Sequence, residues 1–272
     1  MTDINSMRHA SMEEAHTMLL EAMKYIDDIC TKENIIYYAA YGTLLGAVRE
    51  HGFIQWDYDA DLWMKREDYK RFIEAEKKYH NPKYFLQTTD SDNGFFLPFL
   101  MRLCINDTSC WASRYKNAPF HTGFHVDIFP LDYGFGSFRE DSRKLWALQK
   151  LHTICYLVKD KFMYVRSLRN LIITLMTSPL KILSLRQWFS IYNKIMRNDS
   201  PDKSVLFNTG GSYSPEREIF SAKLFANTIE LPFEDMMIKC PVKYDEILTQ
   251  LYGDYMTPRG QENANPNIWV KA

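Results

Sequence analysis

The stretch YGTLLGAVREHGFIQWDYDADLWM, residues 41–64, decides the fold of this chain, and the other elements are placed around it. Two small residues at 42–43 open an apolar run that predicts a short helix, which ends at 51–52. The segment 59–64 alternates acidic and apolar residues, which predicts a strand with its acids on one face. A turn, a short helix and an acidic strand in this order indicate phosphoryl or nucleotidyl transfer.

The acids of this stretch, Asp57, Asp59 and Asp61, stand two residues apart. Alternate side chains of an extended strand share a face, so Asp59 and Asp61 are expected about 6–7 Å apart at Cα. Carboxylates that close repel each other unless a cation joins them, and Mg²⁺ or Mn²⁺ prefers oxygen ligands. We therefore expect a divalent metal at Asp59 and Asp61. The alternative is a solvated turn.

The turn at Gly42 and Thr43 has the properties that bind an anionic donor. Free amide groups at a helix N-terminus hold phosphate, and small residues let it approach the backbone. Arg49 and Arg102 are candidates for the same phosphate, because a guanidinium group forms paired hydrogen bonds with its oxygens. The alternatives are a simple helix cap at the turn and an ordinary ion pair for each arginine.

A third acid stands in GFHVDIFPLD, residues 123–132. Asp127 lies between Val126 and Ile128 in an apolar strand, where an unpaired charge is costly. We expect it to complete the metal site or to accept the proton of the attacking hydroxyl. A salt bridge to an arginine is the alternative.

Further candidates surround these acids in the sequence: His51, Trp56, Asp57 and Tyr58. His51 alternatively caps the short helix. His121 and His125 are four residues apart, a spacing that would suit zinc binding on a helix. They flank a glycine in a loop that enters a strand, so we do not expect zinc there.

An aromatic box for a quaternary ammonium group is a further hypothesis, because such contacts contribute about 0.5–2 kcal/mol each. The residues for it are Tyr37, Tyr38, Tyr41, Trp56, Tyr58, Trp63 and Trp111. The alternative, which we favour, is that these rings pack in the core.

Periodicity predicts an α+β fold in which a mixed sheet is flanked by helices. Helices are expected at 12–33, 66–79 and 244–252, strands at 35–41, 59–64, 84–87, 97–105 and 124–129, and a turn-rich loop at 199–215. The chain divides into an N-terminal helical segment (1–34), a catalytic core (35–135), a basic helical region (136–204) and a C-terminal segment packing on the core (205–272).

Composition excludes several classes of protein. With 46% hydrophobic and 25% charged residues, the chain is neither disordered nor of low complexity. A net charge of −1 argues against nucleic acid as a partner. The five cysteines form no CxxC pair, which indicates a reduced, intracellular protein. No secretory signal is recognisable, and the longest strongly apolar uncharged run, 170–180, is shorter than the roughly 20 residues of a membrane span.

Positive charge is concentrated between residues 139 and 203, a region that contains 13 Lys and Arg but only 5 Asp and Glu. Apolar residues are interleaved with these cations. The region is either a helical hairpin with a solvated basic face or a hairpin that contacts an anionic membrane or a lipid-linked substrate.

Three blocks together resemble the LicD family, which includes bacterial phosphocholine transferases and fukutin-related enzymes. The first is GTLLGAVREHGFIQWDYDADLWMKREDYKRF, the second GFHVDIFPLD and the third LYGDYMTP. They occur in order and span residues 35–258. WDYDADL stands where the commoner family form is WDDDIDI.

The resemblance implies a nucleotidyltransferase-like fold and Mg²⁺-dependent transfer from a CDP-activated donor to a cell-surface glycan. It implies that Gly42 and Thr43 contact donor phosphate and that Asp59, Asp61 and Asp127 hold metal. The leading hypothesis is phosphocholine transfer from CDP-choline to a lipid-linked teichoic acid, capsule or lipopolysaccharide precursor. It would take place in the cytoplasm or peripherally at the inner face of the plasma membrane. The alternatives are another CDP-linked phospho-alditol, a nucleotidyltransferase and a non-catalytic glycan- or membrane-binding protein.

Overall fold

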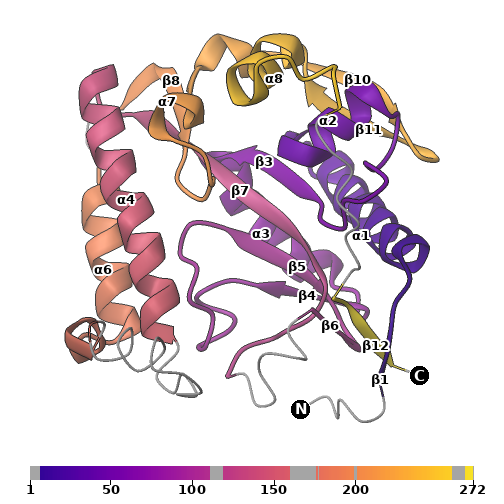
Figure 1. Cartoon of the computed structure of the whole chain (residues 1–272), viewed down its shortest axis with the longest axis horizontal. Helices are drawn as coiled ribbons and strands as arrows, with labels where there is room; N and C mark the ends of the chain where they lie inside the picture. The colour runs from indigo at the N-terminus through magenta and orange to yellow at the C-terminus, as the bar shows by residue number, and fades with distance from the viewer. Residues whose placement is uncertain are drawn as a thin grey trace.

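The computed structural model describes residues 7–110, 119–159, 176, 178–198, 201–258 and 267–271. They form a twisted mixed sheet with two long helices on one face and a helical hairpin at its side (Figure 1). The predicted α+β class is confirmed, and the fold is consistent with a nucleotidyltransferase-like domain.

The main sheet is organised around its longest strand. Its order is β2 (Tyr37–Ala39), β3 (Asp61–Lys65), β7 (His125–Gly134), β5 (Met101–Ile105) and β4 (Tyr84–Gln87). β3 and β7 are parallel, whereas the other neighbours are antiparallel. The last residues of β7 pair with β8 (Asp202–Asn208), and β8 pairs with β9 (Ile219–Ser221). β7 therefore joins the N-terminal and C-terminal parts of the sheet.

Helices α1 (Met12–Lys32) and α3 (Arg66–Tyr79) lie next to each other behind this sheet (Figure 1). A capping box starts α1: the Ser11 side chain accepts from the Glu14 amide, and the Glu14 side chain accepts from Ser11. The residues predicted for the inner face of α1 are buried from Ala15 to Ile29. Apolar periodicity thus directs α1 onto the core.

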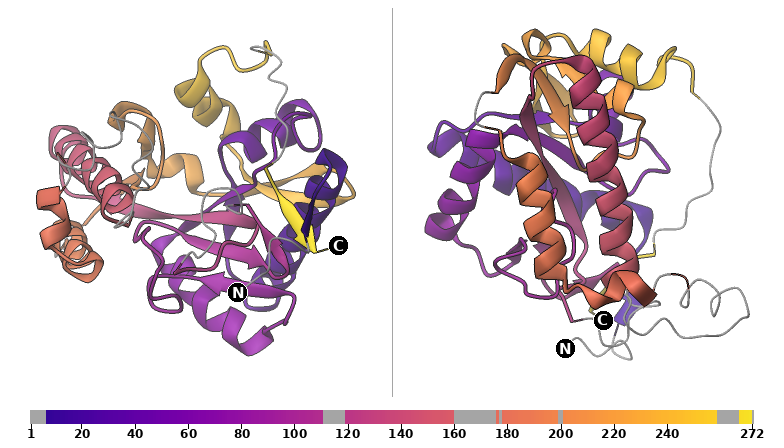
Figure 2. Two further views of the ribbon diagram at one scale, coloured as in Figure 1. Left: turned by 60° about the horizontal axis from the view of Figure 1, so that its bottom comes forward. Right: turned by 90° about the vertical axis from the view of Figure 1, so that its left-hand side faces the viewer.

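The basic region forms a hairpin of α4 (Phe138–Lys159) and α6 (Leu185–Met196), with the 3-10 helix η2 (Ser178–Ile182) between them in the chain. The two helices run side by side along one side of the molecule (Figure 2). The predicted helical character is confirmed for these parts. Most of the apolar run 170–180 lies outside the described residues.

The predicted loop at 199–215 is wrong in its first half, because β8 occupies Asp202–Asn208. The segment VLF at 205–207 has a high strand propensity, but it is short and turn residues flank it on both sides, so the sequence pattern as a whole indicates a loop. Two other predicted strands are shorter than expected and correspond to β2 and β5. The predicted short helix is α2 (Tyr41–Arg49), which begins one residue before the Gly42-Thr43 pair.

The C-terminal part contains α7 (Pro215–Glu218), η3 (Ala222–Phe225), the hairpin β10 (Thr228–Phe233) and β11 (Met236–Pro241), and α8 (Tyr244–Tyr252). Near the termini, β12 (Trp269–Lys271) lies between β1 (Met7–His9) and β6 (Thr108–Ser109). The division into four segments stays a prediction. All five cysteines are free. Within the described part of the chain, no helix combines the length and apolar character needed to cross a bilayer.

Candidate active site

The parallel pairing of β3 with β7 places Asp61 directly opposite Asp127 in the sheet register. Just before β3, the Asp127 amide donates to the carbonyl of Ala60 at 2.9 Å. These two acids are 66 positions apart in the chain, and the predicted juxtaposition of acids from separate strands is what the structure has. Asp59 lies in the extended segment that leads into β3.

Burial and mutual repulsion both disfavour the charged forms of these acids. Burial, followed by the charges of Asp59 and Asp127, raises the pKa of Asp61 well above its usual value. Solvent reaches the Asp59 side chain, but the protein atoms crowded around its carboxyl group and the neighbouring Asp57 carboxylate raise its pKa as well. Without a counterion, the cluster therefore resists full ionisation.

A divalent cation would relieve this repulsion, and the donor set is the all-oxygen set that Mg²⁺ or Mn²⁺ prefers. Among the described residues, no three His, Cys, Asp or Glu side chains already form a group that could hold a metal ion. Mg²⁺ is commonly bound by one or two carboxylates together with water and substrate phosphate, so a closed cage is not required. Asp59, Asp61 and Asp127 fit this open kind of site.

Asp127 also has a fixed ion-pair partner. Nε of Arg102 donates to Oδ1 of Asp127 at 2.8 Å, and both residues are largely buried. The charge of Asp127 raises the pKa of Arg102 despite burial, so the guanidinium stays charged. The ion-pair alternative therefore holds for both residues, and phosphate binding by Arg102 stays a prediction.

His125 approaches the same oxygen, with Nε2 3.5 Å from Oδ1 of Asp127. Its Nδ1 lies 2.8 Å from the carbonyl oxygen of Gly123, which can only accept, so Nδ1 carries the hydrogen. Burial and the charge of Arg102 lower the pKa of His125 to about 4, so the ring is neutral at pH 7. Nε2 then has no proton to donate. Arg102 and His125 thus both approach Oδ1 of Asp127.

The Gly42-Thr43 pair lies against the acids. The Thr43 hydroxyl accepts from the Asp61 amide at 2.9 Å, which links the first turn of α2 to the start of β3. A Cβ atom at Gly42 would stand 2.5 Å from Oδ2 of Asp57, so any other residue at position 42 would displace the Asp57 carboxylate. The pair is thus placed next to the metal candidates. Its contact with donor phosphate stays a prediction.

A network that the sequence analysis missed holds Tyr41, the residue before this pair. Tyr41 has a φ of +43°, a conformation that costs a non-glycine residue about 1–3 kcal/mol. Its hydroxyl donates to Oε2 of Glu218 at 2.7 Å and accepts from Nδ2 of Asn208 at 2.5 Å. Burial raises the pKa of Glu218 to about 7. Asn208 and Glu218 belong to no periodic pattern. Their only signal in the sequence is that a polar side chain stands next to an apolar strand segment.

Arg49 and His51, two of the predicted site residues, have structural roles. Arg49 bonds Glu50 at 2.7 Å and the carbonyl of Tyr255 at 3.1 Å, so the ion-pair alternative holds. His51 has a φ of +57° directly after the end of α2, in agreement with the capping alternative. Both ring nitrogens of His121 are engaged, one by the side chain of Asn106 and one by a backbone amide, which disfavours zinc there.

The aromatic box is not assembled as a unit. Tyr37, Tyr38, Tyr41 and Trp63 are buried in the core, as the packing alternative predicts. Trp56 and Tyr58 are half-buried beside Asp57, and Trp111 lies outside the described residues. Any ammonium contact would therefore come from a subset of these rings.

Carboxylates on adjacent parallel strands, beside the first turn of a short helix, define a nucleotidyltransferase-like domain. Residues 34–154 match the family described as LicD/FKTN/FKRP, nucleotidyltransferase domain. The chain therefore carries a LicD family domain, and that domain indicates a LicD-type phosphotransferase, a transferase of phosphorus-containing groups.

Relatives extend the similarity beyond this domain. The chain is 26% identical to the lipopolysaccharide cholinephosphotransferase LicD of Haemophilus influenzae, over 96% of this chain and 97% of that protein. Shorter matches are found with two uncharacterized Rickettsia proteins. RT0683 of Rickettsia typhi is 38% identical over 25% of this chain and 22% of its own length, and RP689 of Rickettsia prowazekii is 46% identical over 18% and 19%.

Proposed function

We propose that this protein transfers phosphocholine from CDP-choline to a hydroxyl of a cell-surface glycan, with Mg²⁺ or Mn²⁺ bound at Asp59, Asp61 and Asp127. The observation that carries the proposal is the similarity to a lipopolysaccharide cholinephosphotransferase over nearly the full length of both chains. The pairing of Asp61 with Asp127 supports the metal assignment, because it gathers oxygen ligands at one end of β3 and β7.

The residues have distinct tasks in this proposal. Bound Mg²⁺ would neutralise the charge that builds up on the transferred phosphate. Arg102 holds Asp127 in a fixed orientation through Oδ1. Thr43 holds the Asp61 backbone, so the carboxylates are pre-positioned around the same point. A carboxylate of this cluster that is not occupied by metal would accept the proton of the attacking glycan hydroxyl.

The substrate range and the cellular location extend this proposal. Other CDP-linked phospho-alditols carry the same diphosphate, so they are the nearest alternative donors. We expect the acceptor to be a lipid-linked lipopolysaccharide, teichoic acid or capsule precursor, and the enzyme to act at the inner face of the plasma membrane. The description of the matched domain as a nucleotidyltransferase domain favours one second candidate, a reaction that forms an NDP-activated compound.

Nucleotide release distinguishes the two reactions. Purified protein is incubated with Mg²⁺, lipopolysaccharide and one donor at a time: CDP-choline, CDP-ribitol, CDP-glycerol or a UDP-sugar. Phosphocholine transfer releases CMP from CDP-choline and labels the glycan. A separate incubation contains CTP and phosphocholine in place of the donor. Release of pyrophosphate there would support the nucleotidyltransferase instead.

The matched control is Asp90→Asn, which removes an exposed carboxylate from the loop after β4. It should keep wild-type turnover, whereas Asp61→Asn should not. If wild-type protein releases CMP from none of the CDP donors, the proposal fails.

A further inference from the structure

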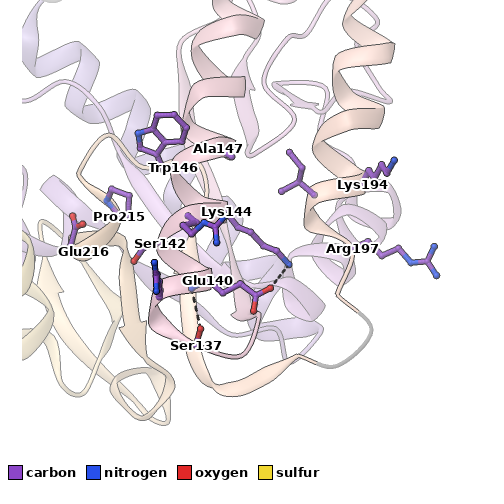
Figure 3. Close-up of a pocket in the computed structure, with 13 residues that line it drawn as sticks. Ser137, Glu140, Ser142, Lys144, Trp146, Ala147, Lys194, Arg197, Pro215 and Glu216 are labelled. Atoms are coloured by element: carbon purple, nitrogen blue, oxygen red, sulfur yellow. Dashed lines mark hydrogen bonds and ion pairs between the residues drawn. The ribbon is translucent and has the colours of Figure 1, made fainter.

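An open groove lies where the two helices of the basic hairpin meet α7, with a volume of about 1220 Å³ (Figure 3). Its cations are Arg139, Arg143, Lys144, Lys194 and Arg197. They come from the first turns of α4, the last turn of α6 and the residue after it. Two carboxylates, Glu140 and Glu216, also line the groove, so positive charge prevails.

The groove contains three cations without a carboxylate partner among the described residues. Lys144 pairs with Glu140 at 3.1 Å, which neutralises one of the two acids. No carboxylate of the described residues pairs with Arg139, Arg143 or Lys194. By contrast, Lys77, Lys78 and Lys83 of α3 and the turn after it each have a carboxylate within 2.7 Å. The groove thus concentrates cations that lack an internal counterion.

Exposed apolar side chains accompany this charge. Phe138 and Trp146, both 57% exposed, belong to the N-terminal half of α4, which also carries groove cations, whereas Met176 and Ile182, 76% and 82% exposed, precede α6 at the opposite end of the hairpin. Trp146 lines the groove itself. Cations next to exposed aromatic side chains are typical of surfaces that lie in the headgroup region of a bilayer. A soluble polyanion would need the cations but not the apolar side chains.

The groove is separate from the acidic cluster. α4 starts four residues after the end of β7, and Asp127 lies near the other end of that strand. The seven residue steps from Asp127 to Gly134 span roughly 23 Å at the rise of an extended strand. The groove cations are therefore not the donor-phosphate ligands of the acidic cluster, and they have no part in the chemistry proposed above.

We propose that the hairpin of α4 and α6 docks on an anionic lipid bilayer, with lipid phosphate groups in the groove around Arg139, Arg143 and Lys194. Charge complementarity with the phosphates and the exposed apolar side chains argue for this occupant. Docking is reversible, because it relies on surface charge and shallow contacts. This inference does not depend on the reaction proposed above.

Co-sedimentation of the full chain with vesicles tests the proposal. The protein should pellet with phosphatidylcholine vesicles that contain phosphatidylglycerol and stay in solution with phosphatidylcholine alone. Pelleting should weaken at high salt, since the screening length falls from ~8 Å at physiological ionic strength to ~3 Å at 1 M. The triple variant Arg139→Glu, Arg143→Glu, Lys194→Glu should bind at least ~10-fold more weakly.

The matched control reverses three exposed lysines away from the hairpin: Lys70→Glu, Lys77→Glu and Lys223→Glu. It has the same net charge as the first variant and should bind nearly as well as the wild type. Equal losses in both variants would overturn the groove as the site. Salt-insensitive pelleting with both kinds of vesicle would overturn charge-driven docking.

Two further outcomes would assign the groove to another ligand and overturn bilayer docking. One is displacement of the protein from vesicles by millimolar inorganic phosphate at constant ionic strength, which indicates a free phosphate site. The other is tight binding to heparin, lost in the first variant, without any pelleting on anionic vesicles.

Discussion

At the scale of single residues, the carboxylates on β3 and β7 carry the proposed chemistry at an electrostatic cost. Asp61 and Asp127 face each other in register, and only Asp127 has a buried cationic partner. Burial, together with the remaining negative charge, raises the pKa values of Asp59 and Asp61. A bound cation would offset this cost, and this is the physical argument for metal binding at the cluster.

Asp59→Asn and Asp61→Asn should each abolish transfer while the metal-free protein folds at least as well as the wild type. Each change removes a like charge from the cluster and also a proposed metal ligand. The measurements are turnover with CDP-choline and the melting temperature without metal. If both variants keep more than about a tenth of wild-type turnover, a deficit of only ~1.4 kcal/mol, the metal assignment is wrong.

Asp127→Asn should reduce kcat much more than it changes KM for the donor. The substitution keeps the shape but removes the charge that completes the site or accepts the proton. The Arg102 charge is then left without its partner, so we also expect a loss of stability of about 3 kcal/mol, typical of a broken buried pair. Kinetics at a temperature well below the melting point separate the two effects. A normal kcat with a raised KM would assign Asp127 to ground-state binding.

At the scale of elements, α2 is held in place from two distant parts of the chain. Asn208 is the last residue of β8 and Glu218 the last of α7, and both bond the hydroxyl of Tyr41. Tyr41 begins α2 in a left-handed conformation, and the Gly42-Thr43 pair follows directly. The hydrogen bonds thus offset the backbone strain at the turn that faces the acids.

The Glu218 carboxyl group should make stability depend on pH. Its pKa rises from 4.5 to about 7 on folding, so the folded state binds the proton more tightly than the unfolded chain. The stabilisation is complete below pH 4.5, decreases as the pH rises toward 7 and is constant above that. By linkage the loss is about 3 kcal/mol.

Glu218→Gln cannot titrate, so between pH 5 and 7.5 its unfolding free energy should fall less than that of the wild type. The exposed neighbour Glu216 supplies the control, Glu216→Gln, which should follow the wild-type pH dependence. Urea unfolding at both pH values gives the comparison. Identical pH dependence in all three proteins would mean that Glu218 titrates normally.

At the scale of the whole molecule, the C-terminal part completes the core that supports the acids. Trp63 of β3 is fully buried and packs against the rings of Phe220 and Phe225 at 5.8 and 5.7 Å. The Tyr38 hydroxyl of β2 donates to the carbonyl of Phe225 at 2.8 Å. β8 covers the edge of β7. Support for the acidic strand thus comes from residues more than 150 positions away.

A chain that ends at residue 204 should not unfold cooperatively. The truncation removes the buried rings of Phe207, Phe220, Phe225 and Phe233. Loss of one large buried side chain costs about 3–5 kcal/mol, and a whole domain is stable by only about 5–15 kcal/mol. Calorimetry of the truncated chain checks this. A sharp transition near the wild-type temperature would contradict the role assigned to the C-terminal part.

The sequence by itself determined the elements whose pattern is local. Helices at 66–79 and 244–252 and the strand at 84–87 have the predicted bounds, since apolar periodicity and turn residues act within a few positions. The acids could be identified as site candidates because an unpaired charge in an apolar strand is energetically costly. The relation to the LicD family followed from motif order.

Only the tertiary structure decided which partner each polar group found. The pairing of Arg102 with Asp127 depends on β5 lying next to β7, and the network at Tyr41 depends on β8 and α7 reaching α2. β8 itself has too few apolar residues to be predicted alone; the edge of β7 supplies its hydrogen bonds. Contacts of this kind join residues far apart in sequence, and no local pattern encodes them.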